Sequence, residues 1–173
     1  MTATLHDGWA HIEPFIESWG AMALFAMIYL ESLGLPLPGE TGAIAGSLLA
    51  SKGELSIVSV YLAVLVGAIL GDSTGYLIGR FGGQAALRKF GPYVGLTAEK
   101  LASVEARFQA GGMWIVFAAR FVPVLRQING LLAGSLALPW HKFLIAQSAG
   151  AVVWASLYCL GPYFFTELFQ LIR

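Results

Sequence analysis

The stretch Gly34-Leu35-Pro36-Leu37-Pro38-Gly39-Glu40 interrupts an otherwise apolar sequence and is called the first break below. Each proline removes a backbone N–H donor and clashes with the preceding turn, so a continuous α-helix through Pro36 and Pro38 is disfavoured. The second break, Arg120-Phe121-Val122-Pro123-Val124-Leu125-Arg126, carries arginines where the first carries a carboxylate. Two interrupted apolar segments with opposite charges indicate a functional site in a membrane protein.

The composition is typical of an integral membrane protein. Of the 173 residues, 57% are hydrophobic and only 12% are charged, whereas soluble domains carry about 25% charged residues. The 21 glycines suit the close packing of membrane helices. The formal net charge is zero, so the overall balance says nothing about partners, and we expect no nucleic acid among them.

The uncharged runs beside the first break are too short to cross a bilayer. Residues 18–30 and 41–51 form runs of 13 and 11 residues. As helices they reach only ~16–20 Å, against a hydrocarbon core of ~30 Å. One compatible structure is a single long helix kinked at the prolines. The other is a re-entrant hairpin with its tip inside the membrane, which we favour because two prolines lie between glycines.

The second break is likewise flanked by two short uncharged runs. Uncharged runs of 12 and 15 residues, 108–119 and 127–141, flank it and are again too short for single spans. By contrast, residues 55–79 contain Asp72 as their only charge, and residues 143–166 contain none. These two segments are therefore the candidates for transmembrane helices.

The two halves of the chain follow one order of elements. An amphipathic interfacial helix is expected at residues 7–19, with a loosely ordered tail as the alternative, and residues 80–107 are expected along the membrane surface. The tetrapeptide Ala-Gly-Ser-Leu recurs at 45–48 and 133–136. One spanning helix separates the hairpins, so they would enter from opposite faces as an inverted repeat. The predicted organisation is a single all-α membrane domain over 1–173, with repeat 1 at 7–80, a linker at 81–96 and repeat 2 at 97–165.

The basic residues predict the orientation. Six Lys or Arg lie within residues 80–110 and at Lys142, whereas the termini and the intervening turn carry only Lys52 and Arg173. By the positive-inside rule, the middle linker is expected in the cytoplasm and both termini outside. The N-terminus lacks the basic region of a cleaved signal peptide, so none is expected.

Glycines recur at four-residue spacing in the first spanning segment. They are Gly67, Gly71, Gly75 and Gly79. Such a stripe lets a neighbouring backbone approach closely, so these residues are predicted to pack helices together. Asp72, Tyr76 and Arg80 form the adjacent stripe, and the last two are expected to support the site.

Five charges fall within the apolar segments. They are the carboxylates of Glu31, Glu40 and Asp72 and the guanidiniums of Arg120 and Arg126. Each is costly in hydrocarbon unless it is paired or hydrated. Because carboxylates are in surplus, one of them is expected to exchange a proton near neutral pH, in a proton-coupling or gating role. The simpler interpretation is that the charges only hold the hairpins together, although apolar residues would do so at lower cost.

Arg120 and Arg126 are the candidate ligands for phosphate. Paired guanidiniums bind phosphate through forked donors, and helices that start after a proline break present unpaired backbone N–H groups. An anionic lipid headgroup would suit such a site. The alternative is that Glu31 and Glu40 occupy the arginines fully and leave nothing for a ligand.

The sequence carries no signature of a soluble-type enzyme. His6, His11 and His141 are scattered, and residues 75–83 lack the lysine and spacing of a phosphate loop. Cys159 is the single cysteine, which excludes an intrachain disulfide and indicates a buried inert thiol. We expect no catalytic residue, no metal and no cofactor.

Three motifs resemble the DedA family of bacterial membrane proteins, whose wider superfamily includes the VTT-domain lipid scramblases of eukaryotes and the SNARE-associated Golgi proteins. The motifs are Leu30-Glu31 followed by Pro38-Gly39-Glu40, then Gly71-Asp72-x-x-Gly75-Tyr76-x-x-Gly79-Arg80, then Ala119-Arg120-Phe121-Val122-Pro123-Val124-Leu125-Arg126 running on to Gly130 and Ala133-Gly134. The resemblance implies that Glu31, Glu40, Arg120 and Arg126 matter for function. The family often has aspartate at the position of Glu40, so the charge is kept.

The resemblance implies lipid translocation in the bacterial cytoplasmic (inner) membrane. The cargo would be undecaprenyl phosphate or a phospholipid such as phosphatidylethanolamine, and membrane lipids would be the partners, with proton coupling and homo-oligomerisation left open. Many members continue with another spanning helix, which leaves the C-terminal topology open. The alternatives are a proton-motive-force-driven exchanger of small cations or drugs, and an envelope-maintenance protein that transports nothing.

Overall fold

The computed structural model describes residues 19–90 and 98–171, and within these ranges the secondary structure is entirely helical. This confirms the predicted all-α class. The helices are Trp19–Ser32, α2 (Gly39–Ser51), α3 (Ile57–Phe90), α4 (Ala98–Ala119), α5 (Pro123–Ser135), α6 (Trp140–Ala155), a π-helical turn η2 (Ser156–Leu160) and α7 (Gly161–Leu171). The predicted interfacial helix at 7–19 lies outside the described residues except for Trp19. Residues 91–96 of the predicted linker 81–96 also lie outside them.

Two helices are long and apolar enough to cross a membrane. They are Ile57–Gly83 and Trp140–Thr166, each of 27 residues, or about 40 Å of helix. The first covers the predicted segment 55–79 from residue 57 onward, and the second contains the whole predicted segment 143–166. The second is continuous through α6, η2 and α7. Its π-turn ends directly before Gly161-Pro162, where the proline lacks an N–H and its ring crowds the carbonyl four residues earlier.

The helix Trp19–Ser32 and α2 lie antiparallel on either side of the first break. The helix ends in a turn at Gly34, whose φ of 108° is accessible to glycine at little cost, and α2 restarts after Pro38. A Cβ at Gly42 would overlap the Met27 side chain, and one at Gly46 would lie 3.1 Å from Leu24. The chain therefore turns back on itself instead of continuing as one kinked helix.

The second break is shorter. α4 ends at Ala119, Val122 is extended, and α5 begins with Pro123 in its first turn, where a missing N–H costs nothing. The twelve-residue run predicted before this break, 108–119, is not one straight helix. It bends at Gly112, where a φ of 50° is tolerated because glycine has no Cβ.

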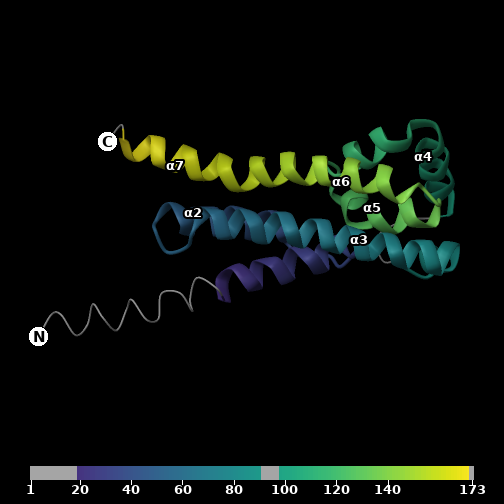
Figure 1. Ribbon diagram of the computed structural model, residues 1–173, viewed down its shortest axis with the longest axis horizontal. Coiled ribbons are helices and arrows are strands. Elements are labelled where there is room, and N and C mark those ends of the chain that lie inside the picture. The colour runs from purple at the N-terminus through teal and green to yellow at the C-terminus, as the bar shows by residue number, and fades with distance from the viewer. Residues whose placement is uncertain (1–18, 91–97, 172–173) are drawn as a thin grey trace, which may run out of the picture.

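The helix Trp19–Ser32, α2, α3 and the continuous α6–α7 run along the long axis of the molecule, and α4 lies at one end of it (Figure 1). The helix Trp19–Ser32 packs on the first half of α3, where a Cβ at Gly71 would lie 2.5 Å from the Tyr29 carbonyl oxygen. α5 packs on the second half of α3, and glycines lie on both sides of that crossing. A Cβ at Gly79 would overlap the Leu131 carbonyl, and a Cβ at Gly130 would overlap the Asp72 carbonyl.

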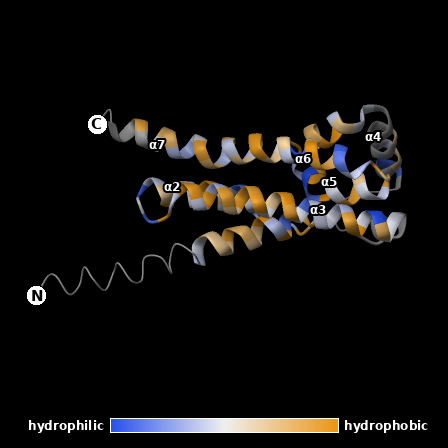
Figure 2. Ribbon diagram, in the orientation of Figure 1, coloured by the Kyte–Doolittle hydropathy of each residue, from blue (hydrophilic) through white to orange (hydrophobic). Residues whose placement is uncertain are grey.

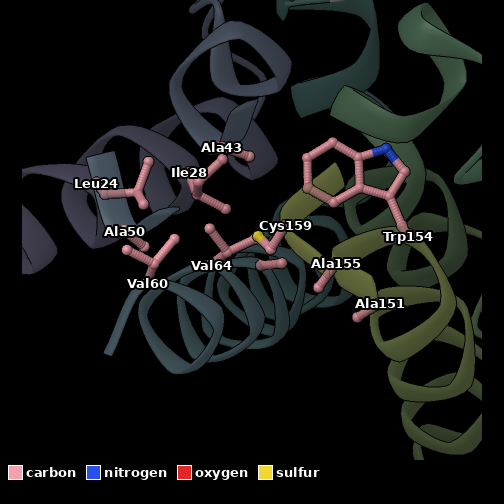
Figure 3. Packing of buried hydrophobic residues seen from close by; sticks show 11 residues of the cluster. Leu24, Ile28, Ala43, Ala50, Val60, Val64, Ala151, Trp154, Ala155 and Cys159 are labelled. Atoms are coloured by element: carbon pink, nitrogen blue, oxygen red, sulfur yellow. The ribbon is translucent and has the colours of Figure 1, made fainter. Parts of the chain in front are cut away.

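Two apolar clusters form the core. The first, shown in Figure 3, joins the helix Trp19–Ser32, α2, the first half of α3 and α6 with its π-turn; it contains Leu24, Ile28, Ala43, Ala50, Val60, Val64, Ala68, Ala151, Trp154, Ala155 and Cys159. The second joins α3, α4, α5 and α6 and contains Tyr76, Val116, Ile128, Leu131, Leu132, Ala133, Phe143 and Ala146. Outside these clusters, Val58, Leu62, Val66 and Leu70 expose an apolar stripe of α3, as lipid contact requires.

The glycine contacts predict different outcomes for two alanine substitutions on α3. Gly79→Ala places a methyl group against the Leu131 backbone, whereas at Gly75 the nearest atom would lie at an ordinary 3.5 Å. Overpacking against backbone costs about 1–3 kcal/mol. We expect Gly79→Ala to lower the thermal unfolding midpoint in detergent and Gly75→Ala to leave it nearly unchanged. The buried thiol of Cys159 reports unfolding through a fluorogenic thiol reagent. Equal midpoints for the two variants would contradict the close approach of α3 and α5.

Candidate functional site

Buried polar side chains form a layer between the two apolar clusters. Along α3, Asp72 lies one turn after Ala68 of the first cluster and one turn before Tyr76 of the second. Along α6, Gln147 lies in the same way between Phe143 and Ala151. Figure 2 shows hydrophilic positions where α5 and α6 meet α3, within otherwise apolar helices. Among the residues that the structure describes, the buried polar and charged ones are Glu31, Ser32, Ser47, Asp72, Arg120, Arg126, Asn129 and Gln147.

Arg126 joins the two breaks through ion pairs. Its Nη2 donates to Glu31 Oε1 at 2.6 Å, and its Nη1 donates to Glu40 Oε1 at 3.0 Å. The side chains of Arg126 and Glu31 are each 6% exposed, whereas that of Glu40 is 40% exposed. The two carboxylates therefore differ: one is enclosed with the guanidinium, and the other has access to the surroundings.

A second ion pair lies deeper. Arg120 Nη1 donates to Asp72 Oδ2, and both side chains are almost fully buried. A Cβ at Gly150 of α6 would lie 3.2 Å from Arg120 Cδ, so the arginine stem packs directly against the second long helix. This pair ties the second break to the middle of α3 and to α6.

Arg126 and its two partners, Glu31 and Glu40, all lie at helix ends. Glu31 lies in the last turn of its helix and Arg126 in the first turn of α5. Each position is unfavourable for that charge in the field of its own helix dipole. Glu40, in the first turn of α2, is favourably placed. Pairing Glu31 with Arg126 offsets both unfavourable positions, and a side chain at Gly39 would overlap the Glu31 carboxylate.

The structure brings together all five charged residues singled out in the sequence, in two groups. Of the supporting residues, Tyr76 donates to the Leu138 carbonyl at 2.5 Å and stacks on Phe143 with ring centroids 4.8 Å apart. Arg80 lies two turns beyond Asp72 and is exposed, outside both groups. Pro36 and Pro38 are exposed.

Two residues of the polar layer and one aromatic neighbour of Arg126 were missed in the sequence. Asn129 Nδ2 donates to the Val116 carbonyl at 3.0 Å, and Gln147 Nε2 donates to the Ile69 carbonyl at 3.4 Å. Trp154 lies with its ring 4.7 Å from the Arg126 guanidinium carbon. The available signals were amide side chains inside apolar runs and a tryptophan far from either end of its run. Over the described parts of the chain, no cluster of His, Cys, Asp and Glu could hold a metal ion.

Two apolar helices and a buried ionic layer define a helical membrane protein, and the charges of that layer come from the two breaks, from Glu31 and from Asp72 of α3. Comparison with known families identifies it further: the VTT domain matches residues 37–164. The chain belongs to the VTT-domain family, which confirms the resemblance to DedA proteins noted in the sequence.

Individual relatives agree with this assignment. An uncharacterized membrane protein of Synechocystis sp. is 39% identical over 88% of this chain and 70% of its own. Undecaprenyl phosphate transporter A of Bacillus subtilis is 30% identical over 70% of this chain and 62% of its own. An alkaline phosphatase-like protein of Lactococcus lactis is 28% identical over 84% of this chain and 71% of its own. The chain spans 62% to 72% of the length of the curated relatives it matches. No solved structure matches it significantly.

The buried pair predicts that losing one partner is worse than losing both. Asp72→Asn leaves the Arg120 guanidinium buried without a counter-ion, which costs about 3–5 kcal/mol. We expect this variant to have a strongly lowered thermal unfolding midpoint. The reactivity of the buried Cys159 thiol measures the unfolding. The double variant Asp72→Leu/Arg120→Met replaces the pair by apolar groups and should recover much of the loss. A double variant less stable than Asp72→Asn would contradict this description of the pair.

Proposed function

We propose that the protein moves a phosphate-bearing lipid across the bacterial cytoplasmic membrane, with undecaprenyl phosphate or a phospholipid such as phosphatidylethanolamine as cargo. The observation that carries the proposal is the unequal pairing of Arg126. One of its carboxylate partners is enclosed and the other, Glu40, is 40% exposed. An anion that reaches the site can therefore replace Glu40 without first unburying Glu31. The name of the Bacillus subtilis relative supports a phosphate-bearing lipid.

The helix pairs are proposed to be re-entrant hairpins. The helix Trp19–Ser32 and α2 have 14 and 13 residues, about 20 Å each, too short to span ~30 Å of hydrocarbon. Arg120 of the second break pairs with Asp72, which lies near the middle of the span Ile57–Gly83. We propose that the hairpins enter from opposite faces as an inverted repeat, with the middle linker in the cytoplasm and both termini outside.

Charge balance gives the acidic residues a role. Three carboxylates face two guanidiniums at the site, so an incoming phosphate adds negative charge to an existing surplus. At short range and low dielectric this is costly unless a carboxylate leaves or takes up a proton. Glu40 is the group that can do both, because its side chain reaches the surroundings. Protonation of Glu40 would release Arg126 Nη1 to the phosphate and couple lipid movement to protons.

The two arginines then act in different places. Arg126 meets the headgroup first because its exchangeable partner is exposed. Arg120 is enclosed with Asp72, so it would bind the phosphate only after the two breaks move apart. Asp72 would then give up Arg120 to the phosphate, as Glu40 gives up Arg126, and in this sense it acts as a gate. Each arginine donates guanidinium N–H groups to the phosphate, Arg126 through the Nη1 that Glu40 releases.

Lipid movement in vesicles tests the phosphate site. The reconstituted protein is expected to accelerate transbilayer movement of a fluorescent polyprenyl phosphate or phospholipid, and Arg126→Ala is expected to abolish the acceleration. Arg126→Lys keeps the charge without the fork and should retain part of it. Lys142→Ala, which removes one exposed charge on α6, is the matched control. Undiminished lipid flux in a folded Arg126→Ala variant would overturn the proposed site.

A second candidate function is supported by the same surplus of carboxylates and the exposure of Glu40. In a proton-driven exchanger, Glu40 would bind a small cation or a cationic drug in place of a proton. This function predicts proton flux from loaded vesicles when cations are added, lost in Glu40→Gln. Lipid flux without cation-dependent proton flux supports the lipid transporter. The absence of both would favour an envelope protein that transports nothing.

A further inference from the structure

Arg126 has a third contact that neither candidate function uses. While its Nη atoms donate to Glu31 and Glu40, its guanidinium carbon lies 4.7 Å from the centroid of the Trp154 ring. Trp154 comes from α6, the second long helix, and is only 3% exposed. A cation over an aromatic ring at this distance is attracted by the ring's negative face, more strongly where water is excluded.

The two kinds of contact respond differently to ligand exchange. The ion pairs use the N–H donors at the edge of the guanidinium, which are the donors that a phosphate needs. The contact with Trp154 uses no N–H donor, so it persists while the Glu40 carboxylate is replaced. We propose that Trp154 is a positioning residue that holds Arg126 in place during this exchange. This inference rests on the proposed function and adds a residue to it.

The indole is itself fixed by neighbours on three helices. It stacks on Tyr158 with ring centroids 4.7 Å apart. Figure 3 shows it within the first core cluster, with Ile28 and Ala43 on the facing helices. Just beyond it, Ser47 Oγ donates to the Cys159 carbonyl at 2.5 Å, and the hydroxyls of Tyr61 and Ser156 lie 3.2 Å apart.

These contacts connect Trp154 to the helix that carries Glu40. Ser47 lies on α2 two turns after Glu40, and its hydrogen bond fixes α2 against the π-turn that directly follows α6. The exchangeable carboxylate and the aromatic ring are thus held at a set spacing around Arg126. The alternative is that Trp154 merely fills the first core cluster. A filler needs apolar volume, whereas a positioning residue needs an aromatic face.

Substitution by Phe and by Leu separates these roles. Phe keeps an aromatic face and Leu keeps only apolar volume, and both leave some empty space. In vesicles containing a labelled polyprenyl phosphate, Trp154→Leu is expected to raise the half-saturating lipid concentration on the order of 2- to 30-fold, with maximal flux less affected. Trp154→Phe should recover most of the affinity. Equal affinities for folded Leu and Phe variants would overturn the positioning role.

A measurement that requires no lipid transport keeps the inference distinguishable from the proposed function. In a double-mutant cycle, Trp154→Leu and Arg126→Met are compared singly and together by unfolding in mixed micelles, with the reactivity of Cys159 as the readout. We expect the unfolding equilibrium constants to depart from additivity on the order of 2- to 30-fold. Additive effects would overturn the contact. A wild-type protein that moves no lipid but shows the coupling would overturn the proposed function alone.

Discussion

The guanidinium of Arg126 is the point where the two breaks of the chain are joined. It lies in the first turn of α5, and its partners come from the end of one helix and the start of another, 95 and 86 residues away in sequence. Burying an unpaired guanidinium in a site this enclosed would cost a large free energy. The carboxylates of the first helix pair supply the counter-charge that Arg126 of the second pair needs, so the ion pairs favour the contact between the two pairs.

Close helix packing makes this meeting possible. α3 presents Gly71 to the Tyr29 backbone and Gly79 to the Leu131 backbone, so each helix pair approaches α3 at nearly backbone contact. At this separation Asp72 of α3 reaches Arg120 in the second break, just before α5 begins. Larger residues at these positions would push the helix pairs outward and leave the charges apart. Backbone proximity, more than apolar burial, sets the geometry of the ionic layer.

The elements could be predicted from the sequence because their causes are local. Pro36 and Pro38 end a helix by their own chemistry, and a run such as 143–166 spans because of its length and lack of charge. The pairing of charges depends on how deep each break lies and how each helix is rotated, so the choice of Asp72 for Arg120 was not predictable. Neither was the bend at Gly112, because a glycine permits a positive φ without requiring it. The Trp154 contact depends on tertiary packing, and an apolar run containing tryptophan is equally typical of a lipid-facing helix.

The π-helical turn at Ser156–Leu160 divides the second long helix into two segments with different rotational phases. A π-turn accommodates one residue more than the α-helical path, and one residue corresponds to about 100° of rotation. Gln147 and Trp154 lie seven residues apart on one face of α6. Because of the π-turn, residues at further seven-residue steps along α7 do not lie on that same face. A relative with an uninterrupted α-helix here would align with this chain residue for residue along α6, but along α7 only after a one-residue gap. Such a gap is a mark by which the turn can be traced through the family from sequence.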